Sequence, residues 1–151
     1  MTLLFDTNAV LIYLRNLPVK GMIESYYKPF GTINTAAVSV VTVGELKAFA
    51  LKNKWGGQKI QTMEEFVSKF VIADINTEDV ISCYAEIDAF SQGRLEGKKS
   101  DFSARNMGKN DIWIAATASV LDAVLLTTDN DFDHLHNEYL IVGKVDLKET
   151  I

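Results

Sequence analysis

Five acidic residues stand at the ends of short apolar runs or near the start of a predicted helix: Asp6, Glu45, Asp111, Asp129 and Asp131. Each has an ordinary structural explanation when taken alone. Aspartate is a good N-cap of a helix, and Thr42 and Glu45 have the spacing of a capping box. That explanation must, however, be repeated at four separate places of the chain. The alternative is that these acids lie together in one site, where their negative charges would repel one another.

Several carboxylates within a few ångströms of one another cannot all stay ionised unless a positive charge compensates them. A divalent cation meets this need, and an oxygen-only ligand set favours Mg²⁺ or Mn²⁺ over Zn²⁺. The chain has no set of cysteines and histidines with zinc-ligand spacing, and His134 and His136 are predicted to be surface residues rather than ligands. A metal held in this way can lower the pKa of a bound water, which then supplies the nucleophile of a hydrolytic reaction, so no protein nucleophile is needed. Cys83 accordingly is predicted to be a small core residue.

The elements that must position these acids alternate along the chain. Short apolar runs predict strands at residues 3–5, 38–41, 70–75, 123–127 and 139–142, and longer stretches predict helices at 9–16, 20–30, 43–52, 58–69, 78–92 and 112–121. This order predicts a three-layer α/β/α sandwich around a mainly parallel sheet of about five strands, within a single domain over residues 1–151. Ligands of such sheets bind outside the carboxyl ends of the strands, where these acids fall.

Length and composition limit the class of protein. The chain has 151 residues, 48% hydrophobic and 23% charged, and no apolar run approaches the roughly 20 residues of a membrane-spanning helix. The N-terminal residues carry no basic leader, so we expect no secretory signal. A lone cysteine excludes a disulfide scaffold within the chain and favours a reducing, cytoplasmic compartment.

The net charge of −5 conceals two basic segments. Residues 47–59 and 92–109 together sum to +7, which leaves −12 for the rest of the chain. Either these segments are solvated faces, or they bind a phosphate backbone. The second interpretation makes six residues candidate nucleic-acid contacts: Lys47, Lys52, Lys98, Lys99, Arg105 and Lys109. Trp55 is a possible stacking residue, although a packing role is the more common one.

Four segments in order resemble the successive motifs of PIN-domain ribonucleases, and most of all the VapC-type toxins of toxin–antitoxin pairs. The segments are Phe5–Asn8, Val40–Leu46, Asn110–Ala118 and Leu125–Phe132. The resemblance covers nearly the whole chain and implies an endoribonuclease that uses Mg²⁺ or Mn²⁺. It also implies a protein antitoxin as partner and a homodimer. The residues themselves predict that the aromatic group of Tyr26, Tyr27 and Phe30 is either core or a surface for a partner helix.

The resemblance assigns roles residue by residue. Asp6 and Asp111 become the strongest metal ligands, Glu45 a ligand or the group that orients the attacking water, and Asp129 a ligand of the same or a second metal, with Asp131 as a fifth member. Thr7, Asn8 and Thr127 match polar positions beside the acids. The stretch from Gly93 to Gly108 departs from the shortest relatives because it is longer and more basic.

Two alternatives remain open from the sequence. A phospho-acceptor receiver domain also places acids at strand ends, but it needs paired acids after the first strand, where this chain has Thr7 and Asn8. A catalytically silent PIN scaffold normally has lost one or more acids, whereas all four are present here.

Overall fold

Parallel strands alternate with helices in the computed structural model, which describes residues 1–98 and 101–148. The strands are β1 (Thr2–Phe5), β2 (Thr35–Ser39), β3 (Val71–Ala73), β4 (Val124–Thr127) and β5 (Ile141–Lys144). The helices are α1 (Thr7–Leu14), α2 (Lys20–Tyr27), α3 (Val40–Lys52), α4 (Gly57–Val67), α5 (Glu78–Ser91) and α6 (Lys109–Val120), followed by the 3₁₀ helix η1 (Asn130–Leu135).

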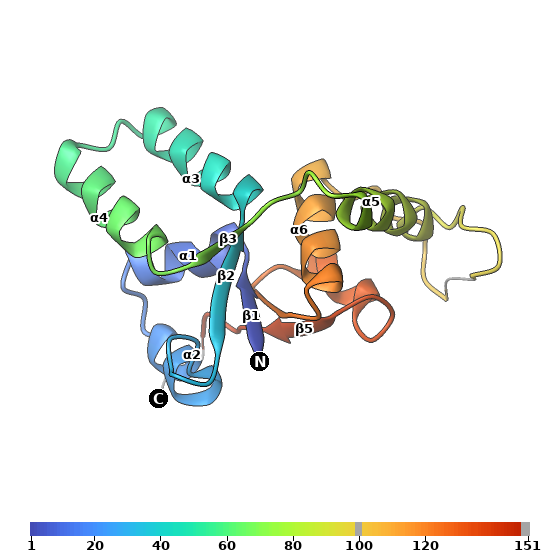
Figure 1. Cartoon of the computed structure of the whole chain (residues 1–151), viewed down its shortest axis with the longest axis horizontal. Coiled ribbons are helices and arrows are strands. Elements are labelled where there is room, and N and C mark those ends of the chain that lie inside the picture. The colour runs from blue at the N-terminus through green and yellow to red at the C-terminus, as the bar shows by residue number, and fades with distance from the viewer. Residues whose placement is uncertain (99–100, 149–151) are drawn as a thin grey trace.

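The sheet has the order β3-β2-β1-β4-β5, and every pair of neighbouring strands is parallel. Strand β1 is central, with β2 on one side and β4 on the other (Figure 1). The carboxyl ends of these three strands therefore lie next to one another. This arrangement confirms the predicted parallel sheet of five strands.

Helices cover both faces of the sheet and form two apolar clusters. On one face, α1, α2 and α4 pack on alternate residues of β1 and β2, such as Phe5 and Val38. On the other face, α5, α6 and η1 pack on the intervening residues, such as Leu4 and Ala37. The alternation follows from the two-residue period of a strand. In Figure 1, α3 and α4 lie on one side of the sheet, and α5 and α6 lie on its opposite side.

The junction between β2 and α3 differs from the sequence prediction. A strand was predicted at 38–41, but β2 ends at Ser39 and α3 begins at Val40. The Ser39 hydroxyl caps the helix by accepting a hydrogen bond from the Val41 amide at 3.1 Å. Thr42 consequently lies inside α3, so the capping box predicted from Thr42 and Glu45 is wrong. Here the local cap outweighs the β-propensity of two valines.

The other elements lie close to their predicted positions, with shifts of a few residues at their ends. Strand β3 is a short edge strand of three residues, and β5 starts two residues later than predicted. The predicted helix at 20–30 ends at Tyr27, and Lys28 adopts the left-handed conformation that closes many helices. Among the described residues, no helix is both long and apolar enough to cross a membrane.

Candidate metal centre at the carboxyl edge of the sheet

Asp6 lies at the centre of this edge, between β1 and α1. Its carboxylate caps α1 by accepting a hydrogen bond from the Ala9 amide at 2.8 Å, and it accepts a second one from the Thr127 hydroxyl at the end of β4. Thr127 also accepts a hydrogen bond from the Asp129 amide at 2.9 Å. Asp6 is only 4% exposed, so two neighbouring strands hold a buried carboxylate in place.

Glu45 reaches the same edge from the first turns of α3. Its carboxylate accepts a hydrogen bond from the Thr7 hydroxyl at 2.6 Å and a longer one from the Asn110 side-chain amide at 3.4 Å. Thr42 lies one turn earlier on α3, with its hydroxyl 3.3 Å from that of Thr7. Side chains from α1, α3 and α6 thus orient this one carboxylate.

Three more acids complete the cluster. Asp111 lies in the first turn of α6, and Asp129 caps η1 by accepting a hydrogen bond from the Asp131 amide at 2.9 Å. Asp111, Asp129 and Asp131 each offer a carboxylate oxygen, and these oxygens lie within 4.8 Å of one another. Their spacing and hard oxygen chemistry fit Mg²⁺ or Mn²⁺.

The acids affect one another electrostatically. Burial raises the pKa of Asp6 to about 6, with hydrogen bonds from Thr127 and Ala9 opposing the shift and the charges of Asp129 and Glu45 adding to it. The pKa of Asp111 is also raised to about 6, first by burial and then by the charges of the other four acids. A cation placed among these groups would lower both pKa values. The charge distribution therefore fits a divalent cation.

A groove of about 600 Å³ opens beside the cluster. Asp6, Glu45 and Asp111 line it, together with Thr7 and the exposed Asn8 from the start of α1. The structure thus places the predicted polar residues Thr7, Asn8 and Thr127 at the site edge. Thr42 and Asn110 also contribute but were not among the predicted site residues. The sequence signal for Asn110 was its place directly before Asp111 in a motif of the family. Thr42 was missed as a site residue because its spacing to Glu45 is that of a capping box.

The two histidines lie outside the acidic cluster. His134 is half-buried, and its Nε2 atom lies 2.8 Å from the hydroxyl of the fully buried Ser91. It is therefore not the surface residue that was predicted, because it links η1 to the end of α5. His136 is exposed, as predicted, and its Nδ1 atom accepts a hydrogen bond from the Val142 amide at 2.9 Å.

The predicted basic contacts differ in their surroundings. Lys52 lines the groove beside the acids, and Arg105 lines a small cavity together with Asp131. Lys47 and Lys109 are exposed on α3 and α6. Lys98, in contrast, lies 3.6 Å from Glu138 and over the ring of Tyr139. Lys99 lies outside the described residues.

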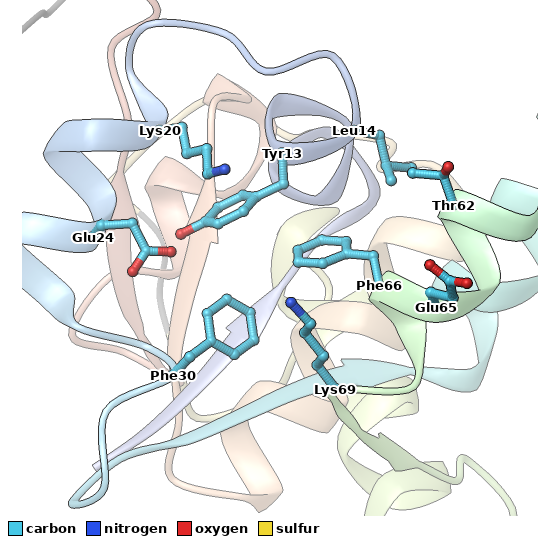
Figure 2. A pocket seen from close by; sticks show the side chains of 9 residues that line it. All are labelled: Tyr13, Leu14, Lys20, Glu24, Phe30, Thr62, Glu65, Phe66 and Lys69. Carbon is cyan, nitrogen blue, oxygen red and sulfur yellow. The ribbon is translucent and has the colours of Figure 1, made fainter. Parts of the chain in front are cut away.

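A second pocket, of about 320 Å³, lies between α1, α2 and α4 (Figure 2). The rings of Tyr13, Phe30 and Phe66 form its apolar part, and lysine and glutamate side chains surround them. Phe30 remains 38% exposed even though it contacts this aromatic group. Among the described residues, the buried hydroxyl of Tyr13 has no hydrogen-bond partner.

Comparison with known families identifies the family to which the chain belongs. The model of the family described as the PIN domain matches residues 3–137, so this chain belongs to the PIN domain family. The receiver-domain alternative is therefore dropped. A comparison with curated protein sequences gave no match.

Solved structures similar to this chain include toxin–antitoxin complexes. A chain of VapBC2 from Rickettsia felis, bound to a DNA fragment from its promoter, is 25% identical, with a TM-score of 0.75 and coverage of 97% of this chain and 100% of that chain. VapBC-1 from nontypeable Haemophilus influenzae matches at 24% identity, with a TM-score of 0.71 and coverage of 95% and 98%. VapBC-5 from Mycobacterium tuberculosis matches at 20% identity, with a TM-score of 0.61 and coverage of 95% and 98%. The latter two matches show a shared fold. Together, the family match and the 25% identical VapBC2 chain confirm the resemblance to VapC-type PIN domains.

Proposed function

We propose that this protein is a metal-dependent endoribonuclease and the toxin of a type II toxin–antitoxin pair. The observation that carries the proposal is the convergence of five carboxylates from separate elements at one sheet edge in a PIN-family chain. A silent scaffold has no need of an acidic cluster that raises the pKa of its own members.

Each carboxylate has a proposed role. Asp6, Asp111, Asp129 and Asp131 would hold Mg²⁺ or Mn²⁺, and Glu45 would act as a further ligand or orient the attacking water. When bound, the cation supplies Lewis acidity that promotes ionisation of water and stabilises charge on the phosphodiester. Thr7 and Asn110 hold Glu45 by hydrogen bonds, so its carboxylate faces the groove in a fixed direction. Thr127 does the same for Asp6.

Cations beside the cluster would hold the RNA backbone. Lys52 lines the groove together with Asp6, Glu45 and Asp111, and Arg105 lines a small cavity together with Asp131. The exposed Lys47 and Lys109 extend the positive surface, and Lys98 and Lys99 stay among the proposed contacts. Phosphate contacts of this kind position a substrate without reading its sequence.

Incubation of purified protein with RNA tests the activity. We expect cleavage with Mg²⁺ or Mn²⁺ and none with EDTA, and we expect Asp111→Asn to cleave roughly 100-fold or more slowly than the parent. A single-stranded DNA of the same sequence tests the preference for RNA. Full cleavage in EDTA would contradict the metal mechanism, and no cleavage under any condition would favour the silent scaffold.

The partner is proposed to be a protein antitoxin whose apolar side chains fill the pocket of Tyr13, Phe30 and Phe66. The exposed ring of Phe30 supports this, because aromatic residues at the centre of an interface carry much of its binding energy. The probe is the product of a short reading frame directly upstream. We expect Phe30→Ala to weaken its binding roughly tenfold or more, while Ile33→Ala, at an exposed residue outside the pocket, leaves binding unchanged.

We also propose that the protein is a homodimer and is cytoplasmic. Light scattering of the purified chain tests the first point, and fractionation of cells that express it tests the second. A monomer at all concentrations would contradict the dimer.

A further inference from the structure

A further cavity lies outside the groove of the acidic cluster, where the chain leaves α5. Its volume is about 340 Å³, and it is lined by Gln92, Arg94, Ala104, Arg105 and Asn106. Two arginines and two carboxamide residues therefore line it, and no acid is among the described residues that do so. Guanidinium and amide groups donate hydrogen bonds, so this lining suits an anion. We call it the arginine cavity.

The end of α5 fixes the position of Arg94. Gly93 has a positive φ of 70°, and its amide donates a hydrogen bond to the Phe90 carbonyl at 3.0 Å. The Arg94 amide donates to the Ala89 carbonyl at 2.8 Å. These two hydrogen bonds are those of a Schellman motif, in which glycine adopts the left-handed conformation without strain. The backbone of Arg94 thus leaves the helix in a defined direction.

Arg105 is held against the same helix end. Its amide donates a hydrogen bond at 2.7 Å to the carbonyl of Ser91, the last residue of α5. Before it in the chain, the Phe102 ring meets the Phe90 ring edge-on at 5.3 Å. After it, the sulfur of the buried Met107 accepts a hydrogen bond from the Ser91 hydroxyl at 3.3 Å. These contacts bring two arginines that are distant in sequence to one cavity.

Neither arginine has an acidic partner in the part of the chain that the structure describes. Ion pairs are formed there by Lys98 and Lys144, but not by the two guanidinium groups. The Gln92 amide donates one hydrogen to the Asp88 carboxylate at 3.0 Å, which leaves its second hydrogen for another acceptor. Because two positive charges at one cavity repel each other, an anion between them would be stabilising.

The arginine cavity adjoins the acidic cluster. Arg105 and Asn106 also line the neighbouring cavity of about 260 Å³, and Asp131 lines that cavity too. A strand with one phosphodiester at the acids can therefore place another phosphate at the two arginines.

A third cavity that shares Arg105 has a different lining. It has a volume of about 560 Å³, and three acids contribute to its walls: Asp101, Asp133 and Glu138. Their negative charges disfavour a phosphate there. The arginine cavity is therefore the place where Arg105 can best contact an anion.

We propose that Arg94 and Arg105 bind one phosphate group of the RNA in the arginine cavity. The inference rests on the proposed ribonuclease function and adds a second fixed point of the substrate, outside the groove that Lys52 lines. The guanidinium groups donate charge-assisted hydrogen bonds to the phosphate oxygens, and the carboxamides of Gln92 and Asn106 donate to the remaining ones. An internal phosphodiester and a terminal phosphate share this chemistry. In Figure 1 the end of α5 is separated from α3 by α6, so RNA that reaches it extends away from α3.

Inorganic phosphate tests the cavity without RNA. The side-chain Nε–H signals of the arginines are followed by NMR in isotope-labelled protein as phosphate is added in EDTA. Arg94→Lys and Arg105→Lys assign the signals. We expect the Arg94 and Arg105 signals to shift and saturate, whereas the signal of Arg15, an exposed arginine outside the cavity, should not. Equal shifts of all three signals would contradict a specific site.

Equilibrium binding of RNA tests the contact with the substrate. The protein carries Asp111→Asn in the presence of Mg²⁺, and the probe is a short fluorescein-labelled single-stranded RNA whose integrity is checked after each measurement. Arg94→Ala should weaken binding roughly tenfold or more at low salt. Arg94→Lys should restore only part of the loss, because lysine keeps the charge but not the planar fork of donors. The exposed Lys148→Ala is the matched control and should bind as the parent does.

Changes in the RNA distinguish an internal phosphate from a terminal one. One series of RNAs replaces each phosphodiester in turn by an uncharged methylphosphonate, and a second series lacks the terminal phosphate at either end. One change should weaken binding to the parent as much as Arg94→Ala does. On the Arg94→Ala protein the same change should cause no further loss, because both remove one contact. The series in which this change occurs identifies the phosphate that is bound.

Two results with RNA would overturn the inference. They are equal binding by parent and Arg94→Ala, and losses from Arg94→Ala and from the RNA changes that add at every position. A parent that cleaves RNA but gives either result would leave the ribonuclease function standing. A parent that binds no RNA at all would overturn both.

Discussion

Asp6 and Asp129 each perform two tasks with one carboxylate. Both cap a helix, as their positions in the sequence predict, and both belong to the acidic cluster. Capping uses one oxygen to accept a backbone amide, which leaves the other oxygen for a different partner. The structural and the functional interpretations of these residues are therefore compatible.

The raised pKa values predict how metal-free protein responds to pH. Asp6 has a pKa of about 6 in the folded chain against 3.8 as its ordinary value, so the folded state binds a proton more tightly than the unfolded state. The free energy of unfolding should therefore rise as pH falls from about 7.5 to about 5, and the gain from this group is complete only below its unfolded pKa. Asp111 shifts in the same direction.

Denaturant titrations in EDTA measure this pH effect. The parent should gain on the order of 2 kcal/mol over that interval, and Asp6→Asn with Asp111→Asn should give a flatter profile. Mg²⁺ should stabilise the parent at about pH 7.5 and much less at about pH 5, because protons compete with the cation. A parent that loses stability from pH 7.5 to 5 in EDTA would contradict the burial of these charges.

Asp111→Asn should separate activity from stability. Loss of a ligand worth several kcal/mol to the transition state lowers the cleavage rate roughly 100-fold or more. Without metal, the variant should unfold at the same temperature as the parent or higher, because one of several like charges is gone. Asp133→Asn is the matched control, since Asp133 is exposed and paired with Lys144 outside the cluster. Cleavage by Asp111→Asn at the parental rate would exclude Asp111 from the site.

At the scale of elements, the turn from β2 into α3 decides where Glu45 points. Ser39 is completely buried and supplies the cap, so α3 starts three residues before its predicted start. That start places Glu45, Phe49 and Lys52 on the face of α3 that meets α1 and α6.

Ser39→Ala should lower the free energy of unfolding by about 1 kcal/mol, because the Val41 amide loses its acceptor. Chemical denaturation measures the loss, and Ser25→Ala, at an exposed residue of α2, should change little. Cleavage below the melting temperature should persist, since Ser39 does not line the groove. An unchanged stability would show that the hydroxyl contributes nothing to the start of α3.

At the scale of the whole molecule, the net charge of −5 opposes binding of RNA, which is itself a polyanion. Binding therefore depends on where the positively charged side chains lie. Lys52 and Arg105 lie beside the acids. Their distribution creates a local positive border around a negative centre that a divalent cation would neutralise.

Replacement of Lys52 and Arg105 by alanine should reduce the salt dependence of RNA binding. Each single-strand phosphate contact contributes about 0.7 to the slope of log K against log salt, so the double variant should lose about 1.4. Lys98→Ala should change the slope less, because the ammonium of Lys98 already contacts Glu138 and the Tyr139 ring. Fluorescence anisotropy across a salt series, with exposed Lys148→Ala as control, makes the measurement. Identical slopes for all four proteins would show that Lys52 and Arg105 do not contact RNA phosphates.

Local patterns in the sequence determined a good part of this protein. Apolar runs marked the strands, the acids that follow them marked the functional edge, and the motif around Asp111 carried the family resemblance. These elements can be predicted because the spacing of apolar residues and the chemistry of helix caps involve only a few neighbouring residues.

Only the tertiary structure decided which distant residues meet. The order of the strands places Thr127 against Asp6 across 121 positions of sequence, and α6 brings Asn110 to Glu45. The same packing places the half-buried His134 against Ser91, and it turns Phe49 into the groove beside the acids. None of these contacts has a local signal, because strand order and helix orientation are set by burial of apolar surface over the whole molecule.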